Sequence, residues 1–424
     1  MPASIECEAG AVRGAGVVSG AALACALALF VGVAGGAGGG AELPGLFGGG
    51  RSENAAGVPA GSAASRAAGL PATDTIAPAS GAAPGVQQVP APRPVHVVMM
   101  VSEGLEPDAS ATEEKVRRVV SQASGWWESQ SAGRVRFEVA DVQPWRSTEV
   151  GCTDVDALWA QAHEWAPQSM EAGHHLLVVL PETAVDQGCE YGYGSMGVLD
   201  SGGSVMVTSL VPSLVAHELG HNLGLGHSHA LICEGAADGR WNARAEQWEQ
   251  GCAEESYDDL LDVMGYSGPG FGETALNAVH LDALGAEPSA VQVVPAAAAG
   301  ASTSVTVRVP PMGSGEPGRA VKVVEPGGPT YYVEYRTAVG LDANFAASGW
   351  KPELGVRILR TDQRFRDASG SFELDATPDD RSDYSRALPV GGRFESADAG
   401  VQVETLATDA DAATIQVTVG APAR

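Results

Sequence analysis

The sequence predicts an α/β domain with a mostly parallel sheet, followed by a β-sandwich. Two observations carry this prediction. Between residues 95 and 181, continuous apolar runs alternate with segments of helical periodicity, and a strand–helix–strand–helix–strand order is typical of a parallel sheet covered by helices. Beyond about residue 290, short segments alternate between apolar and polar residues and are separated by Gly, Pro and Asp turns, as in an antiparallel sandwich.

The first domain is expected over residues 95–289. Its predicted strands are 95–102, 134–142 and 174–181, with shorter strand candidates at 194–200 and 203–209. Its predicted helices are 111–131, capped by Thr112, then 154–166, then 213–224 with Ser213 as cap and Gly224 as stop, and finally 273–285. Ser and Thr favour helix N-caps and Gly favours helix ends, which supports these bounds.

The second domain is expected over residues 290–424. Its candidate strands include TSVTVRV, TYYVEYR, GVRILRT and ATIQVTV. The boundary is expected within the stretch PSAVQVVPAAAAGAST.

The N-terminal part of the chain indicates export. Residues 14–36 form an uncharged apolar run that follows Arg13 and leads into small residues, so we interpret residues 1–36 as a signal peptide or an uncleaved signal anchor. Residues 37–94 consist mainly of Ala, Gly, Pro and Ser. They are expected to be a disordered linker or a short pro-segment. The protein is therefore expected to be secreted and extracellular, or anchored at the cell surface.

The charge balance excludes one large class of partners. The formal net charge is −27, and binding to nucleic acid requires clustered Lys and Arg. We expect no nucleic-acid partner, no membrane contact other than the possible N-terminal anchor, and a monomer.

Four cysteines lie outside the export segment, at positions 152, 189, 233 and 252. An even number in an exported chain predicts two disulfides. Three pairings are possible, and we favour Cys152–Cys189 with Cys233–Cys252 because these are neighbours in sequence. A CxxC spacing is absent from the sequence, which argues against a cysteine zinc site.

The stretch HELGHNLGLGHSHA, residues 217–230, carries the strongest chemical signal. His217 and His221 are four residues apart and share one face of a helix, where two imidazoles can bind one zinc ion. Glu218 lies beside them as a general base. The stretch fits H-E-x-x-H-x-x-G-x-x-H, in which Gly224 allows a sharp turn that returns His227 to the metal. His229 lies two residues further on and is expected near the site or on the surface, not on the metal.

This motif resembles that of the metzincin clan of zinc endopeptidases. The combination of HELGHNLGLGHS, a cysteine loop and YDDLLDVMG most resembles the gametolysin-like (M11-type) peptidases. The resemblance is most specific over residues 213–266 and looser over residues 95–285. It implies a zincin catalytic fold, one catalytic zinc ion and a protein or peptide substrate.

The resemblance also assigns roles to residues after the histidines. Met264 is expected to form the methionine turn, a hydrophobic floor below the ligands. Tyr266 is a candidate donor to the oxyanion, although a packing role is equally open. Residues 194–200 are expected, by analogy with the clan, to be an edge strand that pairs with an extended substrate, although an ordinary strand without that role is at least as open.

The predicted function is a zinc-dependent endopeptidase. Zinc held by three neutral imidazoles keeps one coordination position open and acts as a Lewis acid, while Glu218 accepts a proton from the attacking water and passes it to the leaving amine. A non-catalytic adhesion protein on a zincin scaffold and a zinc hydrolase of non-peptide amides are the alternatives. Calcium is possible but unsupported, because the carboxylates of YDDLLD and DATPDD lack EF-hand spacing and suggest solvated acidic loops.

Overall fold

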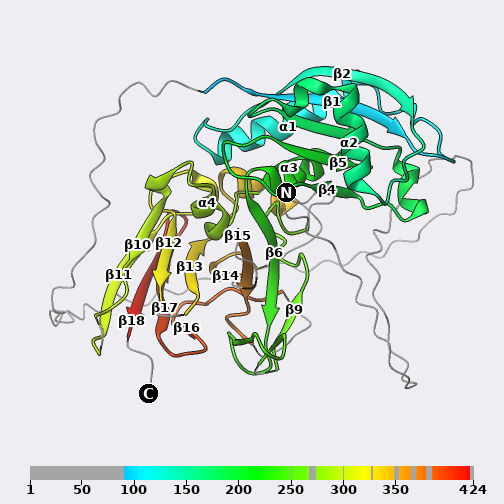
Figure 1. Ribbon diagram of the computed structural model, residues 1–424. Helices are drawn as coiled ribbons and strands as arrows, with labels where there is room; N and C mark the ends of the chain where they lie inside the picture. The colour runs from blue at the N-terminus through cyan, green and yellow to red at the C-terminus, as the bar shows by residue number, and fades with distance from the viewer. Residues whose placement is uncertain are drawn as a thin grey trace, which may run out of the picture. The chain divides into compact units, whose positions relative to one another are not determined.

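The computed structural model describes residues 90–420, apart from residues 250, 267–273, 299, 326–327, 348–352, 363, 365–368 and 379–383. A five-stranded sheet lies in the first part of these residues, with the strand order β2-β1-β3-β5-β4 (Figure 1). In that order its strands are Phe137–Ser147, Arg93–Val101, His175–Val179, Gly203–Val207 and Gly192–Gly194. Every neighbouring pair is parallel except β4 and β5, so the prediction of a mostly parallel sheet is confirmed.

Helices cover both faces of this sheet. Val97 of β1 packs into one hydrophobic cluster with α1 (Glu113–Gln130) and α3 (Pro212–Asn222). Val98 packs into a second cluster with α2 (Val155–Trp165). Successive side chains of a strand point to opposite faces of the sheet. A strand covered on both faces is therefore mostly apolar, as β1 is from Val97 to Val101.

The helix starts agree with the sequence prediction in one case and differ in another. The Thr112 hydroxyl accepts a hydrogen bond from the backbone N–H of Lys115 at 3.2 Å, so Thr112 caps α1 as predicted. The prediction of Ser213 as the cap of α3 is wrong. Val211 occupies the N-cap position and makes no side-chain cap, and Pro212 begins the helix. Proline suits the first helical position because its φ is already helical and it has no N–H to satisfy.

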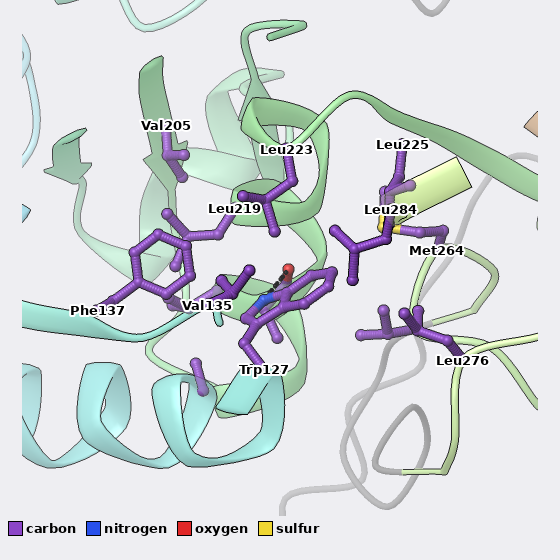
Figure 2. Close-up of a cluster of buried hydrophobic side chains, with 14 of the residues drawn as sticks. Trp127, Val135, Phe137, Val205, Leu219, Leu223, Leu225, Met264, Leu276 and Leu284 are labelled. Atoms are coloured by element: carbon purple, nitrogen blue, oxygen red, sulfur yellow. Dashed lines mark hydrogen bonds between the residues drawn. The ribbon is translucent and has the colours of Figure 1, made fainter. Parts of the chain in front are cut away.

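Trp127 connects α1 to α3. Its side chain is fully buried, and its indole Nε1–H donates to the backbone oxygen of Ala216 at 3.1 Å (Figure 2). The same cluster contains Leu219 of α3 and Met264. A buried tryptophan contributes a large apolar area and, once its N–H is satisfied, a fixed orientation, so this contact holds α3 in place against the rest of the domain.

The edge strand of the sheet differs from the prediction. Residues 194–200 leave the sheet after Gly194, because the Gly197 N–H donates to the backbone oxygen of His221 at 2.9 Å. Ser201 N–H then closes a turn onto the Val198 oxygen at 2.8 Å. A backbone that bonds to the end of α3 cannot also continue the ladder with β5. The prediction of a strand over residues 194–200 is wrong, and the antiparallel edge strand is the shorter β4.

The second part of the described residues is rich in strands. A seven-stranded sheet has the order β10-β12-β13-β14-β15-β6-β9. In that order its strands are Val291–Val294, Ala320–Val324, Thr330–Tyr335, Val356–Thr361, Ser369–Leu374, Leu225–Ile232 and Ala253–Glu255. β6 directly follows α3 in sequence and pairs with β15 in parallel, as the neighbouring arrows in Figure 1 show. The segment that bears His227 is thus one strand of this sheet.

A four-stranded antiparallel sheet completes the all-β region. Its order is β11-β18-β17-β16, and in that order its strands are Thr303–Val309, Ala413–Val419, Val401–Thr408 and Arg393–Glu395. Its apolar side chains share one buried cluster with those of the seven-stranded sheet. The fold class is therefore a mixed α/β domain with a mostly parallel sheet, followed by an all-β region. The domain boundary at residues 289 and 290 stays a prediction.

The last helix is shorter than predicted. Residues 274–277 are not helical, and α4 spans Ala278–Leu284. It begins there because the Asn277 side chain accepts from the His280 N–H at 2.9 Å, which is the geometry of an N-cap. Short elements complete the described chain: β7 (Trp241–Asn242), β8 (Gln247–Trp248), and the 3-10 helices η1 (Pro167–Met170), η2 (Glu182–Gln187), η3 (Pro288–Ala290), η4 (Met312–Ser314) and η5 (Gly340–Ala347).

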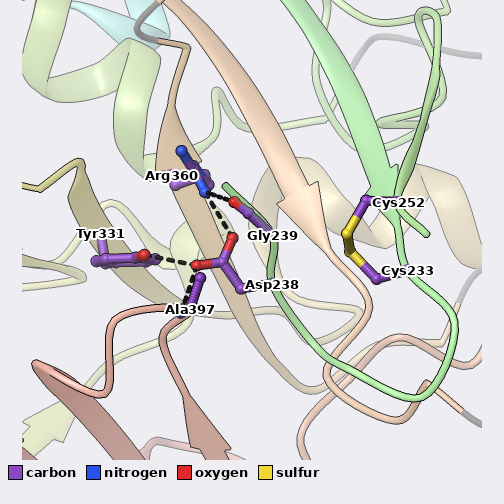
Figure 3. The surroundings of a disulfide bond; sticks show 7 residues. All are labelled: Cys233, Asp238, Gly239, Cys252, Tyr331, Arg360 and Ala397. Carbon is purple, nitrogen blue, oxygen red and sulfur yellow. Dashed lines mark hydrogen bonds and ion pairs between the residues drawn. A yellow bond between two sulfur atoms is a disulfide. The ribbon is translucent and has the colours of Figure 1, made fainter. Parts of the chain in front are cut away.

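Two disulfides are present, Cys152–Cys189 and Cys233–Cys252, the pairing favoured from the sequence. The second closes the loop between β6 and β9. Figure 3 shows Asp238 of this loop accepting from Arg360 at 2.6 Å and from the Tyr331 hydroxyl at 2.6 Å. The loop is therefore tied both to itself and to the seven-stranded sheet.

The predicted export segment and linker, residues 1–36 and 37–94, lie outside the described residues up to residue 89. Among the helices that the structure does describe, none combines the length and the apolar character needed to cross a bilayer.

Candidate metal centre

The three predicted histidine ligands come together in the structure. α3 presents His217 and His221, whose ring centroids lie 5.0 Å apart. The chain reverses at Gly224, whose φ of +94° lies in the left-handed region that only glycine enters without strain. β6 then returns His227 to within 4.7 Å of the His221 ring centroid. One ligand atom from each of the three side chains lies within 4.8 Å of the others.

The hydrogen bonds behind these rings set their tautomers. His217 Nδ1 lies 2.7 Å from the Val263 oxygen, and His221 Nδ1 lies 2.8 Å from the Leu225 oxygen. A backbone oxygen can only accept, so each Nδ1 carries the proton and each Nε2 presents a lone pair. Such carbonyl partners are typical of histidines that bind a metal through the other nitrogen.

The lone pairs converge on one point. His221 Nε2 lies 3.1 Å from His227 Nε2, close to the separation of about 3.3 Å that two nitrogens have on one tetrahedral zinc ion. Burial is the main cause that lowers the pKa of His217 to about 3 and that of His221 to about 4. The imidazoles are therefore neutral near pH 7, as ligands must be. This donor set fits a zinc ion.

Glu218 is buried between α3 and the edge strand. Burial, and secondarily the charge of Glu190, raise the pKa of its carboxyl group well above the usual value. A Cβ atom at Gly192 would overlap the Glu218 carboxylate, and one at Gly194 would overlap its backbone oxygen. The absence of side chains at these two positions of β4 therefore creates the space that the Glu218 carboxyl group occupies.

Met264 is fully buried. A Cβ atom at Gly220 would meet its sulfur, so the thioether packs directly against the helix between His217 and His221. Its backbone is held by Asp262, whose carboxylate accepts from the Met264 N–H at 2.7 Å, and by the Ser228 N–H, which donates to the Met264 oxygen at 2.8 Å. Its assignment as a methionine turn stays a prediction.

The prediction that the acidic run YDDLLD is a solvated loop is wrong. Asp259 and Asp262 are both fully buried. Arg357 donates to Asp259 at 2.6 Å, and His280 Nδ1 lies 2.9 Å from Asp262. His280 and Arg357 lie 18 and 98 residues away from these carboxylates in sequence, and the pattern of the run itself does not indicate such partners.

Two tyrosines need to be distinguished at this site. Tyr266, the candidate from the sequence, is half-buried, and burial together with the neighbouring Tyr191 raises the pKa of its hydroxyl. Its role at the oxyanion stays a prediction. Tyr257, which sequence reasoning missed, has its hydroxyl 3.4 Å from His227 Nε2. It stands at no fixed spacing from the histidine motif, so only the fold reveals its position.

His229 lies outside the histidine triad but not on the open surface. It is 8% exposed, and its Nδ1 accepts a hydrogen bond from the backbone N–H of Tyr257 at 3.0 Å. Its ring centroid lies 5.9 Å from that of His227. The fourth histidine of the stretch thus contacts the loop that carries Tyr257.

The comparison with family models agrees with this geometry. Residues 113–228 match the model described as metallo-peptidase family M12B, reprolysin-like. This segment is similar to reprolysin-like metallopeptidases. It runs from the start of α1 to just past His227, and its histidine triad is intact, as a zinc endopeptidase requires. The match spans well under half of the chain.

The comparisons with curated proteins and with solved structures give weaker similarity. No curated protein matches the chain in sequence. Among solved structures, metalloproteinase-II from Bacteroides fragilis has 14% identity and a TM-score of 0.30, over 47% of this chain and 54% of that one. This chain thus covers about half the length of the Bacteroides protein.

Two further solved structures are similar at a still lower level. A chaperone–substrate complex has 11% identity and a TM-score of 0.25, over 46% of this chain and 34% of that one. Catalytically inactive OgpA from Akkermansia muciniphila, in complex with an O-glycopeptide, has 12% identity and a TM-score of 0.25, over 80% and 97%. Likeness at this level carries no conclusion about this chain.

Proposed function

We propose that this protein is a secreted zinc endopeptidase in which Glu218 is the general base. The observation that carries the proposal is the convergence of His217, His221 and His227 beside a buried carboxyl group. The histidines would hold the ion, which supplies a Lewis acid that polarises a peptide carbonyl and makes water more acidic. A divalent charge there also favours the ionised form of Glu218, against the effect of burial.

Glu218 is the residue that moves the proton. Its carboxylate accepts a proton from the attacking water and donates it to the amine of the leaving peptide, which therefore departs as a neutral group. The buried position excludes bulk water, so the proton is not lost to solvent. The glycines of β4 keep the carboxylate against the edge of the sheet.

The substrate is proposed to be a protein chain in extended conformation. β4 is one of the two edge strands of the described five-stranded sheet, and an extended peptide can add to such an edge through backbone hydrogen bonds. Secretion is supported by the two disulfides, which persist in oxidising compartments. The likeness to gametolysin-like peptidases and the monomeric state remain part of this proposal.

The experiment is casein hydrolysis by purified protein, with zinc content measured on the same samples. We expect activity that a chelator abolishes and added zinc restores. Glu218→Gln is expected to retain zinc and to lower kcat by about 10²- to 10⁴-fold. The matched control is Glu138→Gln, an exposed glutamate on β2, which should behave as wild type.

Two results would refute the proposal. Casein hydrolysis that is indifferent both to the chelator and to Glu218→Gln would place the activity elsewhere or in a contaminant. A zinc-loaded wild-type protein that cleaves no protein substrate would instead support a binding protein on a zincin scaffold. Hydrolysis of simple acyl amides without peptide cleavage would indicate a different zinc hydrolase.

A further inference from the structure

The turn after β9 places a phenol against the metal ligands. The Tyr257 ring centroid lies 4.4 Å from that of His227 and 6.2 Å from that of His217. Its hydroxyl is 3.4 Å from His227 Nε2, the same atom that lies 3.1 Å from His221 Nε2. The hydroxyl therefore lies on the side of His227 where the metal-binding lone pair points.

The backbone of Tyr257 is held in an unfavourable conformation. Its φ is +61°, a left-handed value that costs a bulky residue roughly 1–2 kcal/mol. Strain of this kind persists only where the surroundings impose it, and it concentrates at functional positions. In this turn the conformation points the ring toward the histidines.

His229 is one of the groups that impose this conformation. Its Nδ1 accepts from the Tyr257 N–H at 3.0 Å, and its imidazole is fixed on β6 between the ring of Phe372, 5.5 Å away, and the Tyr257 ring, 5.8 Å away. The next residues are anchored as well. Asp258 accepts from Arg386 at 2.5 Å and Asp259 from Arg357 at 2.6 Å.

We propose that Tyr257 is a catalytic residue whose hydroxyl donates a hydrogen bond to the substrate carbonyl oxygen as that oxygen gains negative charge, and that His229 is the positioning residue for it. The inference rests on the proposed endopeptidase function. The phenol keeps its proton throughout, and no bond to Tyr257 is made or broken. A donor directed at developing charge stabilises the transition state more than the bound substrate.

The test compares Tyr257→Phe with wild type in three measurements. On a peptide spanning the most rapidly cleaved casein bond, kcat should fall by about 10²- to 10³-fold with little change in KM, as for the loss of one oxyanion donor. Affinity for a phosphinic peptide built on the same sequence, measured by calorimetry, should fall by a similar factor, because the phosphinate mimics the charged oxygen. Zinc content and the thermal midpoint should equal those of wild type.

Two companion variants sharpen the comparison. Tyr384→Phe removes a hydroxyl from an exposed tyrosine and should change none of the three measurements. Tyr266→Phe should lower kcat less than Tyr257→Phe does. The reverse order would assign the role to Tyr266 and overturn the proposal.

Other outcomes separate this proposal from the proposed function. If Tyr257→Phe keeps the wild-type kcat and phosphinate affinity, the donor role is wrong although the peptidase stands. Loss of zinc in this variant would make the hydroxyl a ligand and would also overturn the donor role. If wild type neither cleaves casein nor binds the phosphinate, the endopeptidase function itself fails.

The role of His229 has its own test. Asparagine can place an oxygen acceptor near the position of Nδ1, whereas leucine cannot. His229→Leu should lower kcat in the same direction as Tyr257→Phe with zinc retained, and His229→Asn should recover most of the loss. In a Tyr257→Phe background, His229→Leu should cause little further loss, because both changes remove one interaction. Additive losses would contradict the positioning role.

Discussion

Asn222 occupies a variable position of the zinc motif, and its side chain connects two other parts of the domain. It follows His221 directly, and its side-chain Nδ2 donates to the Ser195 oxygen at 2.8 Å. Its Oδ1 lies 3.0 Å from His175 Nδ1 on β3. One amide thus ties the end of the metal-binding helix to the sheet and to the segment after β4. The motif alone leaves this position open to any residue.

His175, which contacts Asn222, makes the stability of the fold sensitive to acid. His175 is fully buried, and burial lowers the pKa of its imidazole to about 4, against an ordinary value of 6.5. Between these two pH values the unfolded chain binds a proton that the folded chain does not. The free energy of unfolding is therefore not reduced by His175 above pH 6.5. It falls by about 3 kcal/mol in total as the pH decreases toward 4, because the unfolded chain gains the proton first.

The measurement is urea unfolding between pH 7.5 and 4.5 in the presence of a chelator, which removes metal release from the comparison. His175→Asn retains a donor toward Asn222 but does not titrate. It should lower the stability at pH 7.5 and show a shallower fall with pH than wild type. Parallel curves for the two proteins would show that His175 does not carry the effect.

At the scale of elements, the site depends on how closely β4 approaches α3. The strand contributes two glycines whose missing side chains leave room for Glu218. A residue with a Cβ atom at position 192 must displace the carboxyl group. The edge strand therefore sets the position of Glu218, the proposed general base.

Gly192→Ala should accordingly lower kcat for casein-derived peptides by at least about tenfold, because a displacement of the base on the order of 1 Å costs up to about 10²-fold. Zinc content should stay unchanged, since no ligand moves. The matched control is Gly125→Ala within α1, where a Cβ atom meets open space and the helix should gain roughly 0.5–1 kcal/mol. An unimpaired Gly192→Ala enzyme would show that Glu218 tolerates the shift.

At the scale of the whole molecule, the all-β region supports the metal centre. β6 carries His227 and His229 and pairs with β15. The turn with Tyr257 is anchored by Arg357 of β14, which pairs with Asp259, and by Arg386 after β15, which pairs with Asp258. Arg357 alone donates to Asp259, Glu334 and Glu373, all within 2.8 Å. Burial by itself would raise the pKa of Asp259, but Arg357 holds it below its usual value.

Removing Arg357 should therefore destabilise the fold strongly. Arg357→Met leaves Asp259 without its buried cation and removes one of two arginine partners from each of Glu334 and Glu373. The expected cost is about 3–5 kcal/mol, measured as the free energy of unfolding in urea. Arg393→Met removes an exposed partner of Glu404 and should cost no more than about 1 kcal/mol. Equal losses in the two variants would show that the buried network adds nothing to stability.

The sequence predicted the parts of this protein that local patterns encode. The apolar runs gave the inner strands, the helical periodicity gave α1 and α2, and the motif gave the three histidines together with Gly224. It failed at residues 194–200, where the backbone bonds to α3, and at the start of α4, where Asn277 caps a shorter helix. It also misjudged YDDLLD, because its partners are distant in sequence.

The sequence by itself determined that three histidines meet, because a helix and a glycine turn bring residues 217, 221 and 227 together over eleven positions. Only the tertiary structure decided what surrounds them. Tyr257 contacts His227 from a turn thirty residues later, and His229 accepts a hydrogen bond from the backbone of that turn. Arginines more than a hundred residues from the motif pair with Asp258 and Asp259 in the same turn. Such contacts depend on strand register and chain reversal, which short-range periodicity does not specify.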